Sequence, residues 1–187
     1  MSVVRSIGIA VLAIVLLFAA AYVSMVWVAD RSFDRALARA GSAEIREFEL
    51  GEVREGIAEV RIAAEGGEEV VGLCRVSPRE ESPEVRVLLV GGIGTGMDAV
   101  RLVGPIPGAE VYSFHYPLKE RLPSGNALSR AASVPSIIKG IAESLVAFGL
   151  AERALQSRED GARTVLIGVS LGVPFVAALA STGERPD

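Results

Sequence analysis

Residues 163–172 read Arg-Thr-Val-Leu-Ile-Gly-Val-Ser-Leu-Gly, and this stretch decides the fold class. Its apolar run is typical of a strand buried on both faces, and the run ends in the pattern Gly-x-Ser-x-Gly. The apolar segment 173–180 comes directly after it, with Pro174 where it suits the first turn of a helix. The stretch therefore predicts a strand, a sharp turn that exposes the Ser170 hydroxyl, and a helix.

The two glycines of the pattern have a steric purpose. Gly168 and Gly172 leave room for a tight turn around Ser170, where larger side chains would collide. The N–H groups at the start of the next helix point toward the place where an oxyanion would form. Ser170 is therefore a candidate nucleophile. The simpler alternative is an ordinary strand–helix turn in which Ser170 only caps the helix.

Upstream of this unit, the sequence predicts five more strands of two kinds. The first three alternate or mix apolar with polar residues, which is typical of half-buried antiparallel strands. The other two are continuous apolar runs, like the run that precedes Gly168. In chain order, the five segments are 44–50, 57–63, 70–76, 85–90 and 110–115.

A helix is predicted from about Pro135 to Gln156, between the last two buried strands. Ser133 is placed to cap it, and Ile137, Ile141 and Leu145 repeat at helical spacing. Antiparallel strands followed by strand–helix alternation predict an α/β fold with a mixed, mostly parallel sheet and flanking helices.

A glycine-rich loop, Gly-Gly-Ile-Gly-Thr-Gly at 91–96, comes after the strand at 85–90. A phosphate-binding Walker loop is excluded, because Met97 and Asp98 stand where Lys and Ser or Thr are required. A dinucleotide-binding fingerprint can be drawn through Gly94, Gly96 and Ala99. That alternative predicts an acid at the end of the next strand, where the sequence has His115 instead.

The strand–Gly-Val-Ser-Leu-Gly–helix unit, the glycine loop and the order of elements resemble the α/β-hydrolase family from residue 44 onward. The resemblance implies a serine hydrolase acting on an ester, thioester or amide through an acyl-enzyme at Ser170. It also implies an oxyanion hole made by the backbone N–H groups of Leu171 and Ile93. The supporting glycines would be Gly168 and Gly172 at the turn and Gly91, Gly92 and Gly94 in the loop. The family often has histidine where this chain has Gly91.

The base and acid of a catalytic triad are missing from their usual place. In this family, the chain order is serine, then acid, then histidine. No histidine comes after Ser170, and Glu184 and Asp187 come too soon after it to be the triad acid. His115 is the only histidine, and its upstream position makes it a poor candidate for the base. We therefore expect the front portion of a larger hydrolase. The alternatives are an inactive fragment or pseudoenzyme, and a dinucleotide-binding protein.

The N-terminal run 7–29 has 23 residues and no charge, which is long enough to cross a bilayer as a helix. It predicts an N-terminal anchor at 1–29, a linker or short polar helix at 30–41, and a hydrolase-like domain at 42–187. A cleaved signal ending near Ala19-Ala20-Ala21 and a buried core helix are the alternatives. Single N-terminal anchors usually export the domain attached to them, so the extracytoplasmic side is favoured for the domain. The four arginines that follow the run (positions 31, 35, 39 and 46) would instead favour a cytoplasmic domain.

Composition excludes several other classes. The net charge of −4 leaves no basic surface for nucleic acid. One cysteine, Cys74, and one histidine exclude an intramolecular disulfide and a histidine-rich metal site. We expect no cofactor and no metal ion, and the expected partners are a small acyl substrate and a lipid bilayer.

Overall fold

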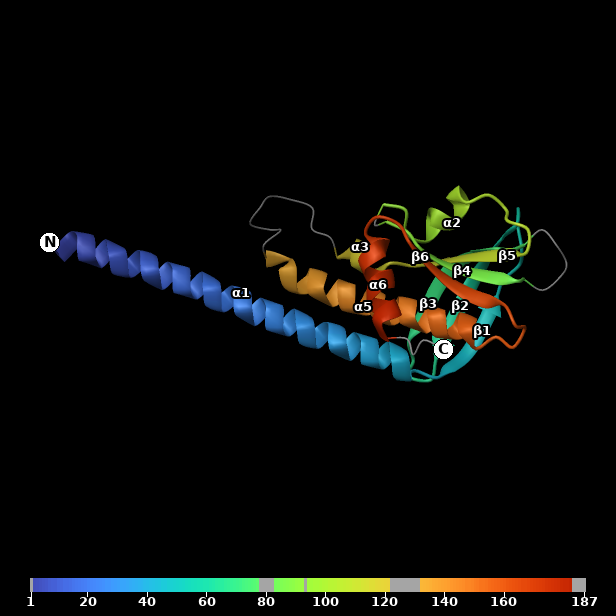
Figure 1. The fold of residues 1–187 in the computed structure, drawn as a ribbon, viewed down its shortest axis with the longest axis horizontal. Coiled ribbons are helices and arrows are strands. Elements are labelled where there is room, and N and C mark those ends of the chain that lie inside the picture. Colours follow the sequence, from blue (N-terminus) through green and yellow to red (C-terminus); the bar gives the residue numbers. More distant parts are fainter. Residues whose placement is uncertain (1, 78–82, 93, 122–131, 183–187) are drawn as a thin grey trace.

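The protein is described by a computed structural model, which covers residues 2–77, 83–92, 94–121 and 132–182 (Figure 1). A single sheet carries helices on both faces. The strands are β1 (Ile45–Leu50), β2 (Ile57–Ala64), β3 (Glu69–Arg75), β4 (Val85–Val90), β5 (Ala109–Phe114) and β6 (Arg163–Gly168). The helices are α1 (Ser2–Ser42), the 3-10 turn η1 (Gly96–Asp98), α2 (Ala99–Leu102), α3 (Pro117–Glu120), α5 (Val134–Gln156) and α6 (Gly172–Thr182).

The sheet order is β1-β2-β3-β5-β4-β6, so β4 lies between β5 and β6. The strands β1, β2 and β3 form an antiparallel meander, and β3 pairs antiparallel with β5. The last three strands are parallel, because β4 pairs in parallel with both of its neighbours. Four strands thus point one way, which confirms the predicted mixed, mostly parallel sheet. Each predicted strand end agrees with the structure to within one residue.

One face of the sheet is covered by α5, α6 and the end of α1 (Figure 1). The apolar side chains of α5 recur at helical spacing, and Leu145, Phe148 and Leu155 are buried against the strands. Phe148 packs edge-to-face on Tyr116 and Phe175, with ring centroids 5.1 and 5.6 Å apart. Among the residues whose side chains the structure describes, which leaves out most of positions 2–18, α5 is the one helix long and apolar enough to cross a bilayer. Its contacts make it the central core helix.

The opposite face is covered less completely. The short helix α2 buries Val100 over β3, β4 and β5, next to Leu89. On β6, Val165 and Ile167 are in register with Val87 and Leu89, so they lie on this same face. They remain 42% and 44% exposed. In the described sheet, β6 bonds only to β4, and its outer edge is unpaired.

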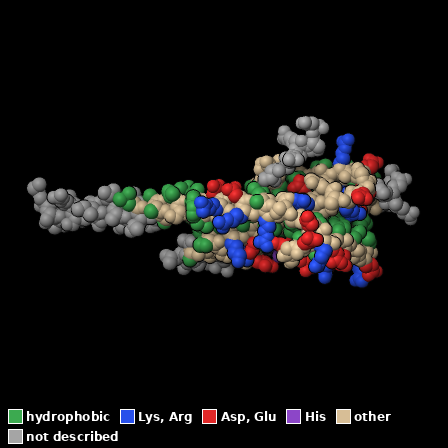
Figure 2. Space-filling model, turned by 90° about the horizontal axis from the view of Figure 1, so that it is seen from below, with side chains coloured by type: hydrophobic (Ala, Val, Ile, Leu, Met, Phe, Trp, Pro, Cys, Tyr) green, Lys and Arg blue, Asp and Glu red, His purple; other side chains and the backbone are tan. Residues whose placement is uncertain are grey.

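The helix α1 continues without a break through 30–41, the segment predicted as a linker or short polar helix. No proline or glycine interrupts α1 between Asp30 and Ala40, and the helix ends at Ser42, one residue after Gly41. Ala36 and Ala40 are buried against α5, and Gly149 allows the close approach because an added Cβ would overlap that of Ala40. Figure 2 shows apolar side chains along the described part of the projecting helix and charged ones mainly over the body.

A buried arginine lies at the end of the sheet away from the Ser170 turn. Arg86, at the start of β4, is fully buried and forms ion pairs with Asp160 and Glu110. Its Nη1 donates a hydrogen bond to the Leu155 carbonyl oxygen at 3.0 Å. Burial, together with the nearby positive charge of Arg158, lowers the pKa of the Arg86 guanidinium. The network joins β4, β5 and the loop before β6.

Candidate active site

Ser170 occupies a strained turn between β6 and α6. Its backbone φ is +55°, in the left-handed region, and only Glu55 shares this property among the described non-glycine residues. For a residue with a Cβ, the left-handed conformation costs about 1–2 kcal/mol. The turn is closed by two hydrogen bonds, from Gly172 N–H to Val169 O (2.9 Å) and from Val173 N–H to Ser170 O (3.1 Å). These bonds hold the Ser170 side chain at the exposed end of the sheet.

The flanking glycines are required by contact with neighbouring backbone. A Cβ on Gly172 would overlap the carbonyl oxygen of Val90, at the end of β4. A Cβ on Gly168 would lie 2.7 Å from the Cα of Val173, on the first turn of α6. Backbone atoms cannot move aside as a flexible side chain can. The steric reason expected for both glycines is therefore present.

The glycine-rich loop after β4 faces the serine. A Cβ on Gly92 would lie 3.5 Å from Ser170 Cβ and 3.7 Å from its Oγ. The Gly92 carbonyl accepts hydrogen bonds from the N–H groups of Thr95 and Gly96 and from the Thr95 hydroxyl. Gly91 is buried and packs closely on Thr95 and on Ala99 of α2. The structure thus brings Gly92 to the serine and Gly91 to Gly172 of the same turn, although both lie about 80 positions earlier in the chain.

The structure describes only one of the two expected oxyanion donors. Leu171 comes after Ser170 in the turn, and its N–H has no acceptor within the part of the chain that the structure describes. Ile93 lies outside the described residues. Gly94, next along the loop, is exposed with open space around it. A backbone N–H without an acceptor, one residue from a candidate nucleophile, is suited to binding an oxyanion.

His115 lies beyond the end of β5, two strands away from β6. Neighbouring strands are about 4.8 Å apart, so roughly 10 Å separates β5 from β6 across β4. The imidazole is half exposed, and its Nε2 lies 3.2 Å from a carboxylate oxygen of Glu120. Among the described residues, no hydrogen bond reaches Ser170 Oγ from a side chain. Glu184 and Asp187 fall outside the described residues.

The glycine loop departs locally from a dinucleotide-binding motif. That motif needs a helix that begins in the loop and points its N-terminus at a pyrophosphate. Here Gly96 begins a 3-10 turn, and α2 has only four residues. The observed geometry therefore favours a loop that supports Ser170.

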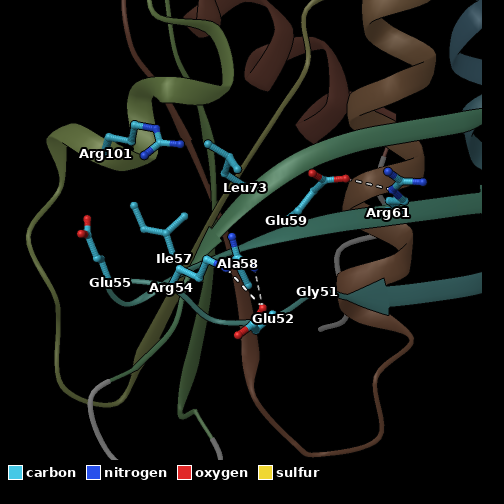
Figure 3. A pocket seen from close by; sticks show the side chains of 10 residues that line it. All are labelled: Gly51, Glu52, Arg54, Glu55, Ile57, Ala58, Glu59, Arg61, Leu73 and Arg101. Atoms are coloured by element: carbon cyan, nitrogen blue, oxygen red, sulfur yellow. Dashed lines mark hydrogen bonds and ion pairs between the residues drawn. The ribbon is translucent and has the colours of Figure 1, made fainter.

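A separate polar cavity of about 550 Å³ lies at the β1–β2 end of the molecule (Figure 3). Arg54 is paired with Glu52 at 2.8 Å, and Arg61 with Glu59 at 2.9 Å. Since these four charges compensate one another at the surface, they leave little net field for a ligand. This cavity shares no lining residue with the Ser170 turn.

No protein-family model and no curated protein matches the chain. Solved structures do match it. The chain is similar to a Bacteroides fragilis protein assigned as an acetyl xylan esterase, with a TM-score of 0.52 and 11% identity. That match covers 85% of this chain and 51% of the other. The fold is esterase-like.

Two further esterases have similar structures with TM-scores of 0.49. One is an acetyl xylan esterase from Paenibacillus sp. R4, 17% identical over 82% of this chain and 55% of the other. The other is a cold-adapted esterase from an Arctic intertidal metagenomic library, 21% identical over 72% of this chain and 59% of the other. The chain thus spans between one half and three fifths of the length of these three proteins.

Sequence reasoning missed the cavity beside the Ser170 turn. Phe175 and Ala178 contribute to it from one face of α6, and Leu171 contributes from the turn just before that helix. Their spacing of four and three residues is the signal that places them on one side of a helix. Which element would cover that side could not be read from the spacing alone.

Proposed function

We propose that the chain carries the nucleophile of a serine hydrolase and that it cleaves an ester, thioester or amide at Ser170. The observation that carries the proposal is the left-handed backbone of Ser170 in a strand-to-helix turn. Such strain persists only where the surrounding structure imposes it, and it concentrates at functional sites. Gly92 lies beside the hydroxyl, where a Cβ added to it would be 3.7 Å from Ser170 Oγ.

In the proposed reaction, Ser170 Oγ attacks the acyl carbonyl carbon while a general base takes the hydroxyl proton. The oxyanion accepts a hydrogen bond from the N–H of Leu171 and a second from the loop after β4. Collapse of the tetrahedral intermediate expels the alcohol, thiol or amine, which takes the proton. Water then hydrolyses the acyl-serine by the same route. Each oxyanion donor contributes about 3–4 kcal/mol to such a step.

A non-catalytic protein is the second candidate, and it rests on the surroundings of the serine. Without a base, a serine hydroxyl is a weak nucleophile. His115 is the only histidine in the sequence, and its imidazole pairs with Glu120 beyond the end of β5. A membrane-tethered pseudoenzyme or an inactive fragment would have this arrangement.

A fluorophosphonate probe separates the two candidates, because it forms a phosphorus–oxygen bond only with an activated serine. We expect the folded chain to be labelled. The Ser170→Ala variant should lose nearly all of this label, because the probe reacts with an activated serine. Ser181→Ala is the matched control, since Ser181 is exposed on α6 and bonds to the Ala178 carbonyl oxygen. Folded wild-type chain that resists the probe would reject the hydrolase proposal and favour the pseudoenzyme.

We also propose that the N-terminal part of α1 anchors the protein in a membrane. The side of the membrane on which the domain lies is not part of this proposal. Apart from Ser24, the described side chains in the run 7–29 are apolar, and nearly all of them are exposed. Tyr22, Val23 and Trp27 are 64%, 64% and 54% exposed, and Leu16 is 60% exposed. A projecting apolar surface of this kind is unfavourable in water and suits lipid.

Alkaline carbonate extraction tests the anchor. We expect the full chain to stay in the membrane pellet, and a Leu16→Asp/Ala19→Asp variant to move largely into the supernatant. Each aspartate near the centre of a span costs about 3 kcal/mol of insertion. N-terminal sequencing of the mature protein covers the alternative of a cleaved signal. A mature chain that starts just after Ala21 would exclude the anchor.

A further inference from the structure

A partly open apolar cavity of about 320 Å³ lies directly beside the Ser170 turn, lined by residues of α1, α3, α5, α6 and the turn itself. Phe33 and Leu37 of α1 form one wall, and Leu118 of α3 contributes to it as well. The α6 side presents Phe175 and Ala178. Every side chain that lines the cavity is apolar. Its volume falls at the lower end of the range of about 300–1,000 Å³ typical of small-molecule sites.

Leu171 connects this cavity to the proposed chemistry. Its side chain lines the cavity and is 47% exposed, while its backbone N–H is the proposed oxyanion donor. An acyl carbon bound at Ser170 would therefore have its hydrocarbon substituent within reach of the cavity mouth. Phe175 and Ala178 of α6 lie one and two helical turns farther from the serine than Leu171, so the cavity leads away from the serine along α6.

The lining selects for hydrocarbon. A cavity without hydrogen-bonding side chains penalises polar groups, whereas each buried methylene contributes about 0.8 kcal/mol. Phe33 lies four residues after the apolar run 7–29, which is about 6 Å along a helix. The cavity is thus close to the end of the proposed membrane segment, where acyl chains are concentrated.

We propose that this cavity is an acyl-chain site, which takes the hydrocarbon tail of a medium- or long-chain fatty acyl ester. The proposal deepens the serine hydrolase proposal and, as a statement about substrate, rests on it. It assigns α1 a part in substrate binding in addition to anchoring, because one wall of the cavity belongs to that helix. A short acetyl group would leave most of the cavity empty.

The test uses the full-length Ser170→Ala chain in phosphatidylcholine nanodiscs and a palmitate that carries a diazirine near its tail. Photocrosslinks mapped by mass spectrometry are expected on the α6 peptide with Phe175 and Ala178, and on the α1 peptide with Leu37. Unlabelled palmitate should compete and acetate should not. Crosslinks confined to residues 7–29 would overturn the proposal, because they report lipid contact alone.

Two pairs of variants test the cavity further. In each pair, one variant fills the cavity with a large side chain and the other places the same side chain at a neighbouring exposed position. Ala178→Phe fills the cavity from α6, and Ala177→Phe adds the same ring at the neighbouring exposed position. Leu37→Trp fills it from α1, and Ala38→Trp is its exposed control. We expect crosslinking at the α6 peptide to fall at least tenfold in each filling variant and less than twofold in each control. Equal crosslinking in a filling variant and its control would overturn the proposal.

This readout does not depend on catalysis, so the two proposals can fail separately. Crosslinks in the cavity without fluorophosphonate labelling would support the acyl-chain site and reject the hydrolase. Fluorophosphonate labelling without cavity crosslinks would support the hydrolase and reject the acyl-chain site. Because the filling variants lie on different helices, misfolding of one leaves the other as a valid comparison.

Discussion

The backbone N–H of Val169 donates a hydrogen bond to the carbonyl oxygen of Val90, with the two atoms 2.9 Å apart. This bond extends the parallel β4–β6 ladder, whose last pair is Val90 with Gly168, into the Ser170 turn. The turn and the glycine loop therefore leave the sheet side by side. Gly92 faces Ser170 for this reason, although the two residues are far apart in sequence.

The first prediction concerns the contact between Gly172 and β4. Gly172→Ala should lower the free energy of unfolding by about 2 kcal/mol or more, because the new Cβ would overlap the carbonyl oxygen of Val90. Gly94→Ala should change it by less than about 0.5 kcal/mol, since no atom lies within 4 Å of a Cβ at that loop position. Chemical denaturation of both variants measures the difference. Equal stability would show that the turn relaxes around the added methyl.

The second prediction concerns strain at Ser170. Ser170→Gly should be more stable than Ser170→Ala by about 1 kcal/mol, because glycine adopts a φ of +55° without the cost of a Cβ. The same pair of changes inside a regular helix has the opposite sign. Thermal or chemical denaturation of the two variants provides the measurement. An alanine variant as stable as the glycine variant would mean that the turn carries no strain.

The third prediction concerns the buried Arg86. Asp160→Asn should destabilise the protein by about 2 kcal/mol or more, since it leaves a fully buried guanidinium without its closest counter-charge. The double variant Arg86→Met/Asp160→Asn should recover part of the loss. Glu52→Gln breaks an exposed pair with Arg54 and should cost less than about 0.5 kcal/mol. Denaturation curves that rank the two single variants equally would contradict the structural role of the network.

The fourth prediction concerns the pH dependence of stability. Burial, with a smaller contribution from the charge of Glu110, raises the pKa of the Cys74 thiol to about 12. In the unfolded chain the thiol ionises near pH 8.5, at about its ordinary pKa. The unfolded state therefore loses its proton first, and stability falls as pH rises above that value. Between pH 8.5 and 10, this group should remove roughly 1.5 kcal/mol of stability.

Cys74→Ala tests that assignment, because it removes the titrating thiol. Burial also raises the pKa values of Tyr112 and Tyr116, so both the wild type and the Cys74→Ala variant should lose stability above pH 10. The difference between wild type and Cys74→Ala should already develop between pH 8.5 and 10, before the tyrosines contribute, and it should keep growing as the pH approaches 12. Two parallel stability curves from pH 8.5 to 10 would show that the thiol ionises equally in both states.

Much of the fold could be predicted because its signals are local. The apolar run before Gly168 and the glycine spacing around Ser170 predicted a strand, a turn and a helix, and the structure has them as β6, the turn and α6. Alternating patterns predicted the antiparallel strands in the same way. The conformation of segment 30–41 was harder to predict, because its composition suits both a polar helix and a linker. The packing of Ala36 and Ala40 against α5 stabilises the helical conformation of this segment.

The candidate site could be predicted only in part. Ser170 and its glycines belong to one short motif, so they were found together. The neighbour relation between Gly92 and the serine depends on the strand order β5-β4-β6, in which β4 lies beside β6. The same order places β5, and with it His115, one strand farther away. Arg86 lies within the buried strand β4, and only the ion pairs with Asp160 and Glu110 explain how its charge is accommodated there.

The sequence by itself determined the strands, the helices α5 and α6, the apolar N-terminal run and the sharp serine turn, because hydrophobic period and glycine position act over a few residues. Only the tertiary structure decided which loop faces Ser170, which charges surround Arg86 and which helices line the apolar cavity beside Leu171. These features join residues tens of positions apart. Their proximity results from strand pairing and the burial of apolar surface across the whole sheet, which no local pattern encodes.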